Sequence, residues 1–463
     1  MLPQIVLDAQ ALHEQKKYKE AAVLYDRILA QNEQNPYILT GLAQTLMHEN
    51  DTLGAALGLF HAAIHQFKEQ HGKVPYETYM LLGLTYKFSG QPEKAKTWLK
   101  EAVKVKESAA TLTNYGQMFV ETDESDKARD ILQRAVKLDP DLALAHWNYS
   151  LCLLQNARKE DNWGEAWEEY EWGLTEGTGQ RILKSFTKLP QWDGQSGSKI
   201  LVYDEQGIGD SIMFVSMLPD LMQRKEVILD CHPRLTTLFS RSFGVQCYGT
   251  RKNKDVDWVD AEKPDAVIAA GSLGKFFRRK NADFPGTPYL KAEPLERDHS
   301  RFRVGISWTG GRSTGRIAKR TVPLNWWQSI LNVPGVEFVS LQYTDGALPE
   351  IESVNRLGYD IRQLPEAQAE DYYETARAVA SCDLIISVCT SIVHLAGALG
   401  VPCWVMVPKH PAWRYQTSGP MPWYKSVRLY RQPAAGADGW LPVVQQVGLH
   451  LADLMDQRRA KAA

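Results

Sequence analysis

A repeat of about 34 residues is the feature of this 463-residue chain that most limits its fold. Small residues recur through the first third of the chain, at Ala9, Ala43, Gly83, Gly116 and Ser150. Twelve residues after the first four come Ala21, Ala55, Ala95 and Ala128, and four residues later come Tyr25, Leu59, Leu99 and Leu132. Because helices cross closely only where side chains are small, this pattern predicts stacked helix pairs within residues 1–173.

The period and its residue types resemble tetratricopeptide repeats. In a fifth unit, Ala166 and Tyr170 take the same roles after an insertion of four residues. The spacing from Ala43 to Gly83 is 40 residues, so we expect a longer helix around residues 65–77. Such pairs stack into a superhelix whose concave face typically binds a peptide or protein. The alternative is an array that only scaffolds or oligomerises.

Composition and charge limit the class of protein. Hydrophobic residues make up 44% of the chain and charged residues 23%, and no apolar run is long enough to span a membrane. The N-terminus lacks the pattern of a signal peptide, and six scattered cysteines favour reduced thiols and a cytoplasmic location. Residues 1–180 carry 18 basic and 26 acidic residues, and the remainder carries 35 and 29. The acidic part disfavours nucleic acid, whereas the basic part suits phosphate groups.

A Gly-rich, polar linker at 174–198 precedes a region in which strands and helices alternate. Strands are expected at 199–204, 226–231, 265–270, 303–308, 336–342, 383–388 and 402–407. Helices are expected at 211–224, 233–242, 323–332, 370–381, 391–399 and about 441–460. This alternation predicts parallel, doubly wound sheets in two lobes, 199–295 and 296–463, with ligands at the carboxyl ends of their strands. The expected fold is therefore an all-α superhelix followed by two Rossmann-like α/β lobes.

The first candidate site is the turn after the strand at 199–204. It contains Gln206, Gly207 and Gly209, followed by Asp210 at the start of a helix. The glycines would let a substrate approach the backbone, and the Asp210 carboxylate could serve as a general base toward an acceptor hydroxyl. The alternative is a tight turn in which Asp210 only caps the helix.

The second candidate site is the turn after the strand at 383–388. Thr390 and Ser391 begin a helix, and His394 follows on the same helix face. Two hydroxyls, free backbone amides and a histidine donor could together hold a diphosphate. The alternative is ordinary helix capping and a histidine of the core.

Further polar residues are expected to surround the second turn. After the strand at 303–308, Ser307 and Thr309 begin a flexible loop that continues through Gly310 and Gly311. Lys319 or Arg320 could neutralise a leaving diphosphate, unless both are solvated surface charges. Gln342 ends a strand, where polar side chains often face a ligand. Trp413 and Arg414 are expected to line the pocket, with core packing as the alternative for Trp413. The sequence has no Asp-x-Asp pair or His/Cys cluster, so we expect no metal site and no cofactor.

Several motifs together resemble bacterial proteins that join tetratricopeptide repeats to a glycosyltransferase domain of the two-lobed B type. They are WDG at 192–194, EQGIGD at 205–210, SLQ at 340–342, HLAGALG at 394–400, and PWY to RLYRQ at 422–432. The domain is similar to heptosyltransferases and, in its plan, to O-linked N-acetylglucosamine transferases. The resemblance implies inverting transfer of a sugar from a nucleotide donor in the C-terminal lobe. It also implies Asp210 as the base, with Thr390, His394 and Arg320 at the donor.

The chain departs from this family at several positions of the same motifs. Cys389 precedes Thr390 where the family has Asp, so a carboxylate that would hold sugar hydroxyls is missing. Ala412 and Tyr415 replace the Asp and Trp that the family has beside Trp413 and Arg414. Because of these changes, the sugar donor could differ from that of the family, and the alternative of a chain without transferase activity stays open.

The sequence therefore predicts a glycosyltransferase whose repeat array recruits a protein and whose lobes transfer sugar to a Ser or Thr hydroxyl. By resemblance, the acceptor is flagellin or another surface protein. One alternative is transfer to a glycan or lipid-linked sugar. The other is a degenerate transferase that acts as a protein-binding module.

Overall fold

The chain forms two compact units, Met1–Cys152 and Leu153–Ala463. The computed structural model describes residues 4–31, 35–122, 124–184, 186, 189–250, 256–310, 317, 319–344 and 346–462. The boundary between the units falls inside one helix, so we describe each unit by itself. The sequence-based boundaries at 173, 198 and 295 remain predictions. No helix of the described ranges is long and apolar enough to cross a membrane.

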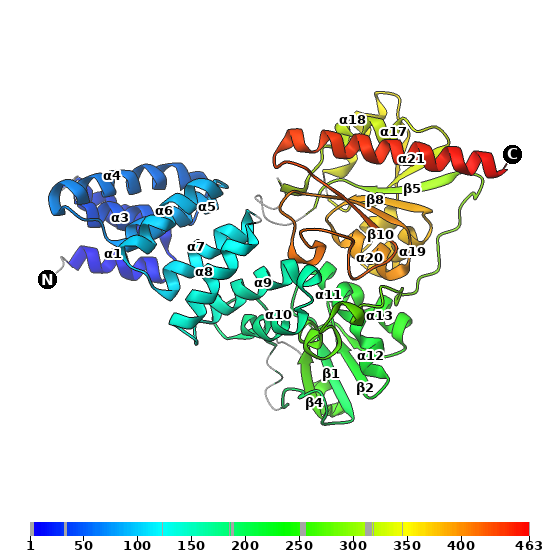
Figure 1. Cartoon of the computed structure of the whole chain (residues 1–463), viewed down its shortest axis with the longest axis horizontal. Coiled ribbons are helices and arrows are strands. Elements are labelled where there is room, and N and C mark those ends of the chain that lie inside the picture. The colour runs from blue at the N-terminus through cyan, green and yellow to red at the C-terminus, as the bar shows by residue number, and fades with distance from the viewer. Residues whose placement is uncertain are drawn as a thin grey trace. The chain divides into compact units, whose positions relative to one another are not determined.

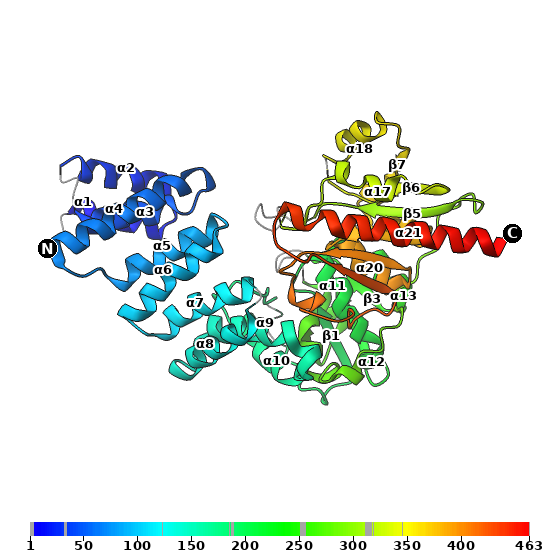
Figure 2. The same cartoon turned by 45° about the horizontal axis from the view of Figure 1, so that its top comes forward.

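Helices build the described residues of the N-terminal part, and they follow one another as stacked antiparallel pairs (Figures 1 and 2). They are α1 (Gln4–Glu14), α2 (Tyr18–Leu29), α3 (Pro36–Leu46), α4 (Leu53–His71), α5 (Tyr76–Phe88), α6 (Pro92–Val105), α7 (Ala109–Glu121), α8 (Ser125–Leu138), α9 (Ala143–Glu160) and α10 (Trp163–Tyr170). The extra residues of the 40-residue spacing lengthen α4, which has 19 residues and ends at the left-handed Gly72. The predicted helix pairs and the lengthened helix are thus confirmed.

The small residues of the repeat lie where paired helices cross. A Cβ atom at Gly83 would lie 2.6 Å from Leu99 Cγ, and one at Gly116 would lie 2.7 Å from Leu132 Cγ. Larger residues at these positions would therefore push the paired helices apart.

The predicted register of the second pair is wrong by one residue. Ala56 and Phe60 are fully buried, whereas Ala55 is exposed and Leu59 is only half-buried. A longer connection, which contains the 3-10 turn η1 (Asn50–Thr52), precedes α4 and shifts its buried face.

The second unit contains two parallel sheets, as in two Rossmann-like lobes. The first sheet has the order β3-β2-β1-β4 and the second the order β10-β9-β8-β5-β6-β7. The strands are β1 (Lys199–Tyr203), β2 (Glu226–Asp230), β3 (Gln246–Tyr248), β4 (Ala266–Ala269), β5 (Phe302–Ser307), β6 (Val336–Ser340), β7 (Ile361–Gln363), β8 (Leu384–Val388), β9 (Cys403–Val407) and β10 (Val427–Arg431). We call the first sheet with its helices the first lobe, and the second sheet with its helices the second lobe.

Seven of these strands lie where the sequence predicts them, and three edge strands were not predicted. β3 and β7 have only three residues each, too few to show an apolar pattern in the sequence. β10 lies at the opposite edge of the second sheet from β7.

The helices that position the site follow strands β1 and β8. The predicted helix at 211–224 is divided into α11 (Ile208–Phe214), the 3-10 turn η3 (Val215–Met217) and α12 (Leu218–Met222). After β8 comes α20 (Ser391–Leu399), which ends at the left-handed Gly400. The C-terminal helix α21 (Leu441–Ala462) packs on the second sheet through residues such as Val444, Val447 and Leu451.

The end of α9 and all of α10 pack against both lobes. Gln416, which lies in the second lobe, donates a hydrogen bond from Nε2 to the Leu154 carbonyl at 2.7 Å. Trp163 Nε1 donates to Asn281 Oδ1 at 2.9 Å, and Trp167 Nε1 donates to the Arg278 carbonyl at 2.8 Å. This last helix pair is therefore part of the α/β unit.

Candidate functional site

The two predicted turns come together where α11 and α20 begin. Gly209, in the first turn of α11, lies against α20 of the other lobe. A Cβ atom at Gly209 would lie 3.2 Å from His394 Cδ2 and 3.4 Å from Ser391 Cα. The carboxyl ends of β1 and β8 thus contribute to one place, which we call the interlobe site: Gly209, Asp210, Thr390, Ser391 and His394.

An ion pair joins the lobes at this site. The Asp210 carboxylate, in the first turn of α11, accepts a hydrogen bond from an Arg414 terminal nitrogen. Arg414 belongs to the 3-10 turn η9 (Trp413–Tyr415), and its guanidinium lies 5.3 Å from the centre of the Trp413 ring. Its Nε atom is buried and has no hydrogen-bond partner among the described residues. Asp210 therefore reaches across the lobe boundary, as well as opening a helix.

The hydroxyls at the start of α20 already have partners. Thr390 caps the helix, because its Oγ1 accepts a hydrogen bond from the Ile392 amide at 3.3 Å. Tyr372 donates its hydroxyl to Ser391 Oγ at 2.8 Å. Both side chains can still meet a ligand through their remaining lone pairs. Thr390 thus caps the helix as in the alternative interpretation, and a role of Thr390 and Ser391 in ligand binding stays a prediction.

His394 is buried in the second lobe and faces the first. Its side chain is 3% exposed, and its Nδ1 lies 3.2 Å from the Tyr424 hydroxyl. Burial, reinforced by the positive charges of Arg414 and Arg320, holds the pKa of His394 well below 6.5. The imidazole is therefore neutral at physiological pH.

Two cations approach the start of α20, beside a neutral thiol. Burial raises the pKa of Cys389 to about 11, although Arg320 and Arg414 both act in the opposite direction. Arg320 has no carboxylate partner within the described part of the chain, whereas Arg414 pairs with Asp210. This part of the site therefore has positive potential. No cluster of three His, Cys, Asp or Glu side chains that could hold a metal occurs in the described ranges.

Ser307, Thr309 and Gln342 form a separate structural cluster at the ends of β5 and β6. Gln342 is fully buried, and its Oε1 accepts hydrogen bonds from Ser307 Oγ at 3.1 Å and from the Thr309 amide at 3.2 Å. Gln342 thus shapes the loop after β5. A Cβ atom at Gly310 would lie 2.5 Å from Thr390 Cγ2, so this loop closes on the start of α20. Gly311 lies outside the described residues.

Trp413 packs in an aromatic cluster that contains residues from three parts of the second unit. Its ring centre lies 5.7 Å from that of Trp167, 6.1 Å from Tyr170 and 6.4 Å from Phe214. The structure thus places Trp413 among apolar rings, next to Arg414 of the site.

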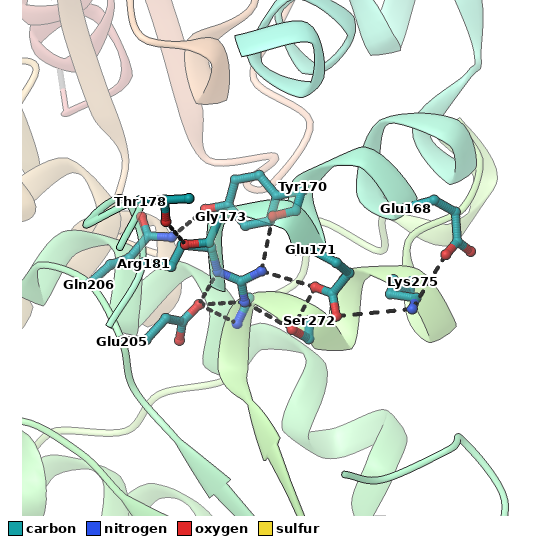
Figure 3. Close-up of polar contacts among 11 residues, drawn as sticks. Glu168, Tyr170, Glu171, Gly173, Thr178, Arg181, Glu205, Gln206, Ser272 and Lys275 are labelled. Atoms are coloured by element: carbon teal, nitrogen blue, oxygen red, sulfur yellow. Dashed lines mark hydrogen bonds and ion pairs between the residues drawn. The ribbon is translucent and has the colours of Figure 1, made fainter. Parts of the chain in front are cut away.

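The last helix pair also holds the first turn. Tyr170, at the end of α10, accepts a hydrogen bond from Gln206 Nε2 (Figure 3). The neighbouring Arg181 side chain is fully buried and lies against the Tyr170 ring, 4.6 Å from its centre. Arg181 pairs with Glu205 and Glu171, each at 2.9 Å (Figure 3).

Lys184 pairs with carboxylates at the ends of β1 and β2 in a similar way. Its Nζ lies 2.8 Å from Asp230 Oδ2 and 3.3 Å from Asp204 Oδ1. Burial opposes the charge of Lys184, but the two carboxylates outweigh it and raise the pKa of the lysine. The segment predicted as a linker therefore supplies buried cations to the first lobe.

Two surface pockets of the second unit are lined by residues other than those of the interlobe site. One, of about 270 Å³, is lined by Asp220, Arg278, Tyr289 and Trp423, among others. The other, of about 310 Å³, is lined by residues that include Arg158, Phe284 and Lys425. Neither lining includes a candidate site residue from the sequence analysis, although Pro422 and Trp423 of the PWY motif are among the lining residues.

Family models confirm the repeats. Tetratricopeptide repeat models match residues 12–57, 76–108 and 109–142. The N-terminal region therefore consists of tetratricopeptide repeats, and the α/β region follows them.

Two curated proteins are similar to parts of the chain. Protein FlbA of Caulobacter vibrioides is 27% identical over 347 residues, which cover 68% of this chain and 56% of that protein. Human Protein IFIT1 homolog B is 28% identical over 155 residues, which cover 32% of each chain. The chain thus spans about half or less of the length of these relatives.

Two solved structures show similarity to about a third of the chain. YrrB, described as a tetratricopeptide repeat protein with an unusual peptide-binding site, is 18% identical, with a TM-score of 0.30. It covers 36% of this chain and 82% of its own. MamA from Desulfovibrio magneticus RS-1 is also 18% identical, with a TM-score of 0.31, and covers 36% of this chain and 90% of its own.

Proposed function

We propose that the chain is an inverting, metal-independent glycosyltransferase of the two-lobed B type. It moves a sugar from a nucleotide-sugar to a protein Ser or Thr hydroxyl. The observation that carries the proposal is the interlobe site, where a carboxylate of one lobe meets the cationic helix start of the other.

The donor diphosphate would bind at the start of α20. The first amides of this nine-residue helix and its dipole favour an anion. Arg320 supplies positive charge without a described carboxylate partner, and the Thr390 and Ser391 hydroxyls add further polar contacts. Gly310, which lies against Thr390, would lie beside the bound diphosphate.

The acceptor hydroxyl would approach from the first lobe. Asp210 takes the proton of that hydroxyl, and the oxygen forms a bond to the anomeric carbon of the sugar. The bond from that carbon to the diphosphate breaks, and the nucleoside diphosphate leaves with the bonding electrons. Arg414 holds the Asp210 carboxylate in place, whereas Arg320 and the α20 amides stabilise the leaving group.

A protein acceptor follows from the repeats, because such arrays typically bind polypeptides. Flagellin or another surface protein remains the acceptor that the family resemblance suggests. Two alternatives stay open. One is transfer to a glycan or lipid-linked sugar. The other is a binding module without activity, which the neutral Cys389 in place of a carboxylate favours.

Mass spectrometry of candidate acceptor proteins, co-expressed with the full chain, tests the proposal. We expect a mass increase of one sugar unit on Ser or Thr, and none with Asp210→Asn. Calorimetry with nucleoside diphosphates, with and without EDTA, tests the donor side. Nucleotide binding that depends strictly on a divalent cation would contradict the metal-independent reaction. Binding of an acceptor without any transfer would favour the binding module.

A further inference from the structure

A chain of hydrogen bonds connects His394 to the first lobe. His394 Nδ1 lies 3.2 Å from the Tyr424 hydroxyl, which lies 3.2 Å from the Tyr289 hydroxyl. Tyr289 in turn donates its hydroxyl to the Ile212 carbonyl of α11 at 2.7 Å. Four residues from four places in the sequence are thus joined in series.

The number of protons in this series of hydrogen bonds determines which atom donates in each bond. Burial raises the pKa values of Tyr289 and Tyr424, so each hydroxyl keeps its single proton. A carbonyl can only accept, so the Tyr289 proton points to Ile212. Tyr424 must then donate to Tyr289. Because the Tyr424 proton is used there, the bond between His394 and Tyr424 needs a proton on Nδ1.

We propose that His394 is held as the Nδ1-protonated tautomer, so that its Nε2 presents a lone pair at the interlobe site. The Cδ2 atom, which is bonded to Nε2, is the part of the ring that faces Gly209. The accepting nitrogen therefore lies on the edge of the ring beside the first-lobe turn.

This tautomer decides which chemical group His394 can bind. The oxygens of an ionised diphosphate have no proton to donate, so an unprotonated Nε2 is a poor partner for them. A hydroxyl group donates readily to such a nitrogen. We therefore assign to His394 the role of accepting a hydrogen bond from a hydroxyl of the sugar or of the acceptor. The sequence-based expectation was different, namely that His394 donates a hydrogen bond to the diphosphate.

The assignment rests on the proposed function and deepens it. Cys389 stands where a carboxylate would accept hydrogen bonds from sugar hydroxyls, and its buried thiol stays neutral. Nε2 of His394 supplies a hydrogen-bond acceptor five residues further along the chain. His394 is thus a specificity-determining residue for a hydroxyl-bearing ligand.

Nitrogen-15 NMR of the full chain, labelled only at its 11 histidines, tests the tautomer without any substrate. The His394 resonances are identified by their loss in His394→Gln. We expect a protonated Nδ1 and an unprotonated Nε2. In Tyr289→Phe, the Tyr424 hydroxyl loses its acceptor and is free to donate to Nδ1, so the Nε2-protonated tautomer should become populated.

Tyr430→Phe is the matched control, because Tyr430 is also buried and its hydroxyl lies 3.0 Å from Nδ1 of another histidine, His450. This variant should leave His394 unchanged. An Nε2-protonated His394 in the wild type would overturn the proposal. A tautomer that does not respond to Tyr289→Phe would overturn it as well. If that variant does not fold, the wild-type spectrum alone decides.

A binding measurement separates this inference from the proposed function. If a sugar hydroxyl donates to Nε2, Tyr289→Phe should weaken binding of a nucleotide-sugar about tenfold and leave the free nucleoside diphosphate unaffected. Equal loss for both ligands would contradict the assignment of a sugar hydroxyl. If no nucleotide binds at all, the proposed function fails, whereas the tautomer is still measured.

Discussion

The two lobes share a fold but differ in the charges at the carboxyl ends of their strands. In the first lobe, Asp204, Glu205 and Asp230 lie there, and the buried cations Arg181 and Lys184 neutralise them. In the second lobe, the corresponding positions carry neutral groups such as Ser307 and Gln342. Arg320, which has no carboxylate partner among the described residues, lies near Cys389.

This difference shows how one fold is used in two ways. Parallel α/β sheets bind ligands at the carboxyl ends of their strands. Among the described residues of the first lobe, salt bridges occupy the ends of β1 and β2, whereas the turn at Gly209 and Asp210 remains available. In the second lobe, the charge of Arg320 has no carboxylate partner within the described ranges and suits an anionic ligand.

The largest effect is expected from removing the carboxylate that the first lobe contributes. Asp210→Asn keeps the size and much of the capping ability but cannot take a proton. We expect turnover to fall about 10²–10⁴-fold, with nucleotide affinity nearly unchanged. Turnover, calorimetry and a melting curve should be measured on the same preparation. Near-normal turnover would leave Asp210 as a helix cap.

The buried pairs of the first lobe should dominate its stability. Arg181→Met leaves the buried Glu205 without its cation, and breaking such a buried pair typically costs about 3–5 kcal/mol. Arg279→Met is the matched control, because Arg279 pairs with Glu168 at 3.1 Å on the surface. That change should cost less than about 1 kcal/mol. Urea unfolding measures both variants, and equal losses would refute the contrast.

Arg320 of the second lobe should act on nucleotide binding. Arg320→Met is expected to weaken nucleoside diphosphate binding about tenfold, which corresponds to about 1.4 kcal/mol. Lys319→Met is the control, because Lys319 is the exposed neighbour in sequence. If both variants bind nucleotide equally well, the positive potential at α20 has another role.

The smallest effect concerns pH. Because burial lowers the pKa of His394 below 6.5, the unfolded chain binds this proton more readily than the folded chain. The contribution of His394 to the free energy of unfolding is therefore fully present above pH 6.5. It falls as pH decreases below 6.5, by at most about 1.4 kcal/mol per pH unit. His394→Gln should reduce this slope between pH 6.5 and 5.5 in urea titrations.

Local patterns in the sequence were enough to predict most of the fold. The repeat spacing gave the helix pairs, and apolar runs gave the central strands of both sheets. The short edge strands β3 and β7 lacked such runs and were missed. The burial register of α4 was missed because a longer connection shifts the helix, and spacing alone does not reveal this.

The candidate site was harder to predict, since its contacts join distant residues. The sequence indicated both turns, but not that Gly209 touches His394. The tyrosines that hold the second turn, Tyr372 and Tyr424, lie 19 and 30 residues from their partners. Of these two tyrosines, only Tyr424 belonged to a motif noted in the sequence, PWY. That motif did not indicate that Tyr424 contacts His394.

The attachment of the last helix pair to both lobes has a consequence for how such proteins diversify. Repeats before residue 153 lie in the first compact unit, so recombination could add, delete or replace them without disturbing the lobes. The end of α9 and α10 cannot be exchanged in this way, because Leu154, Trp163 and Trp167 bond to the lobes. A chimaera that takes its acceptor preference from another protein should therefore be joined within α9, and not in the polar segment that follows α10.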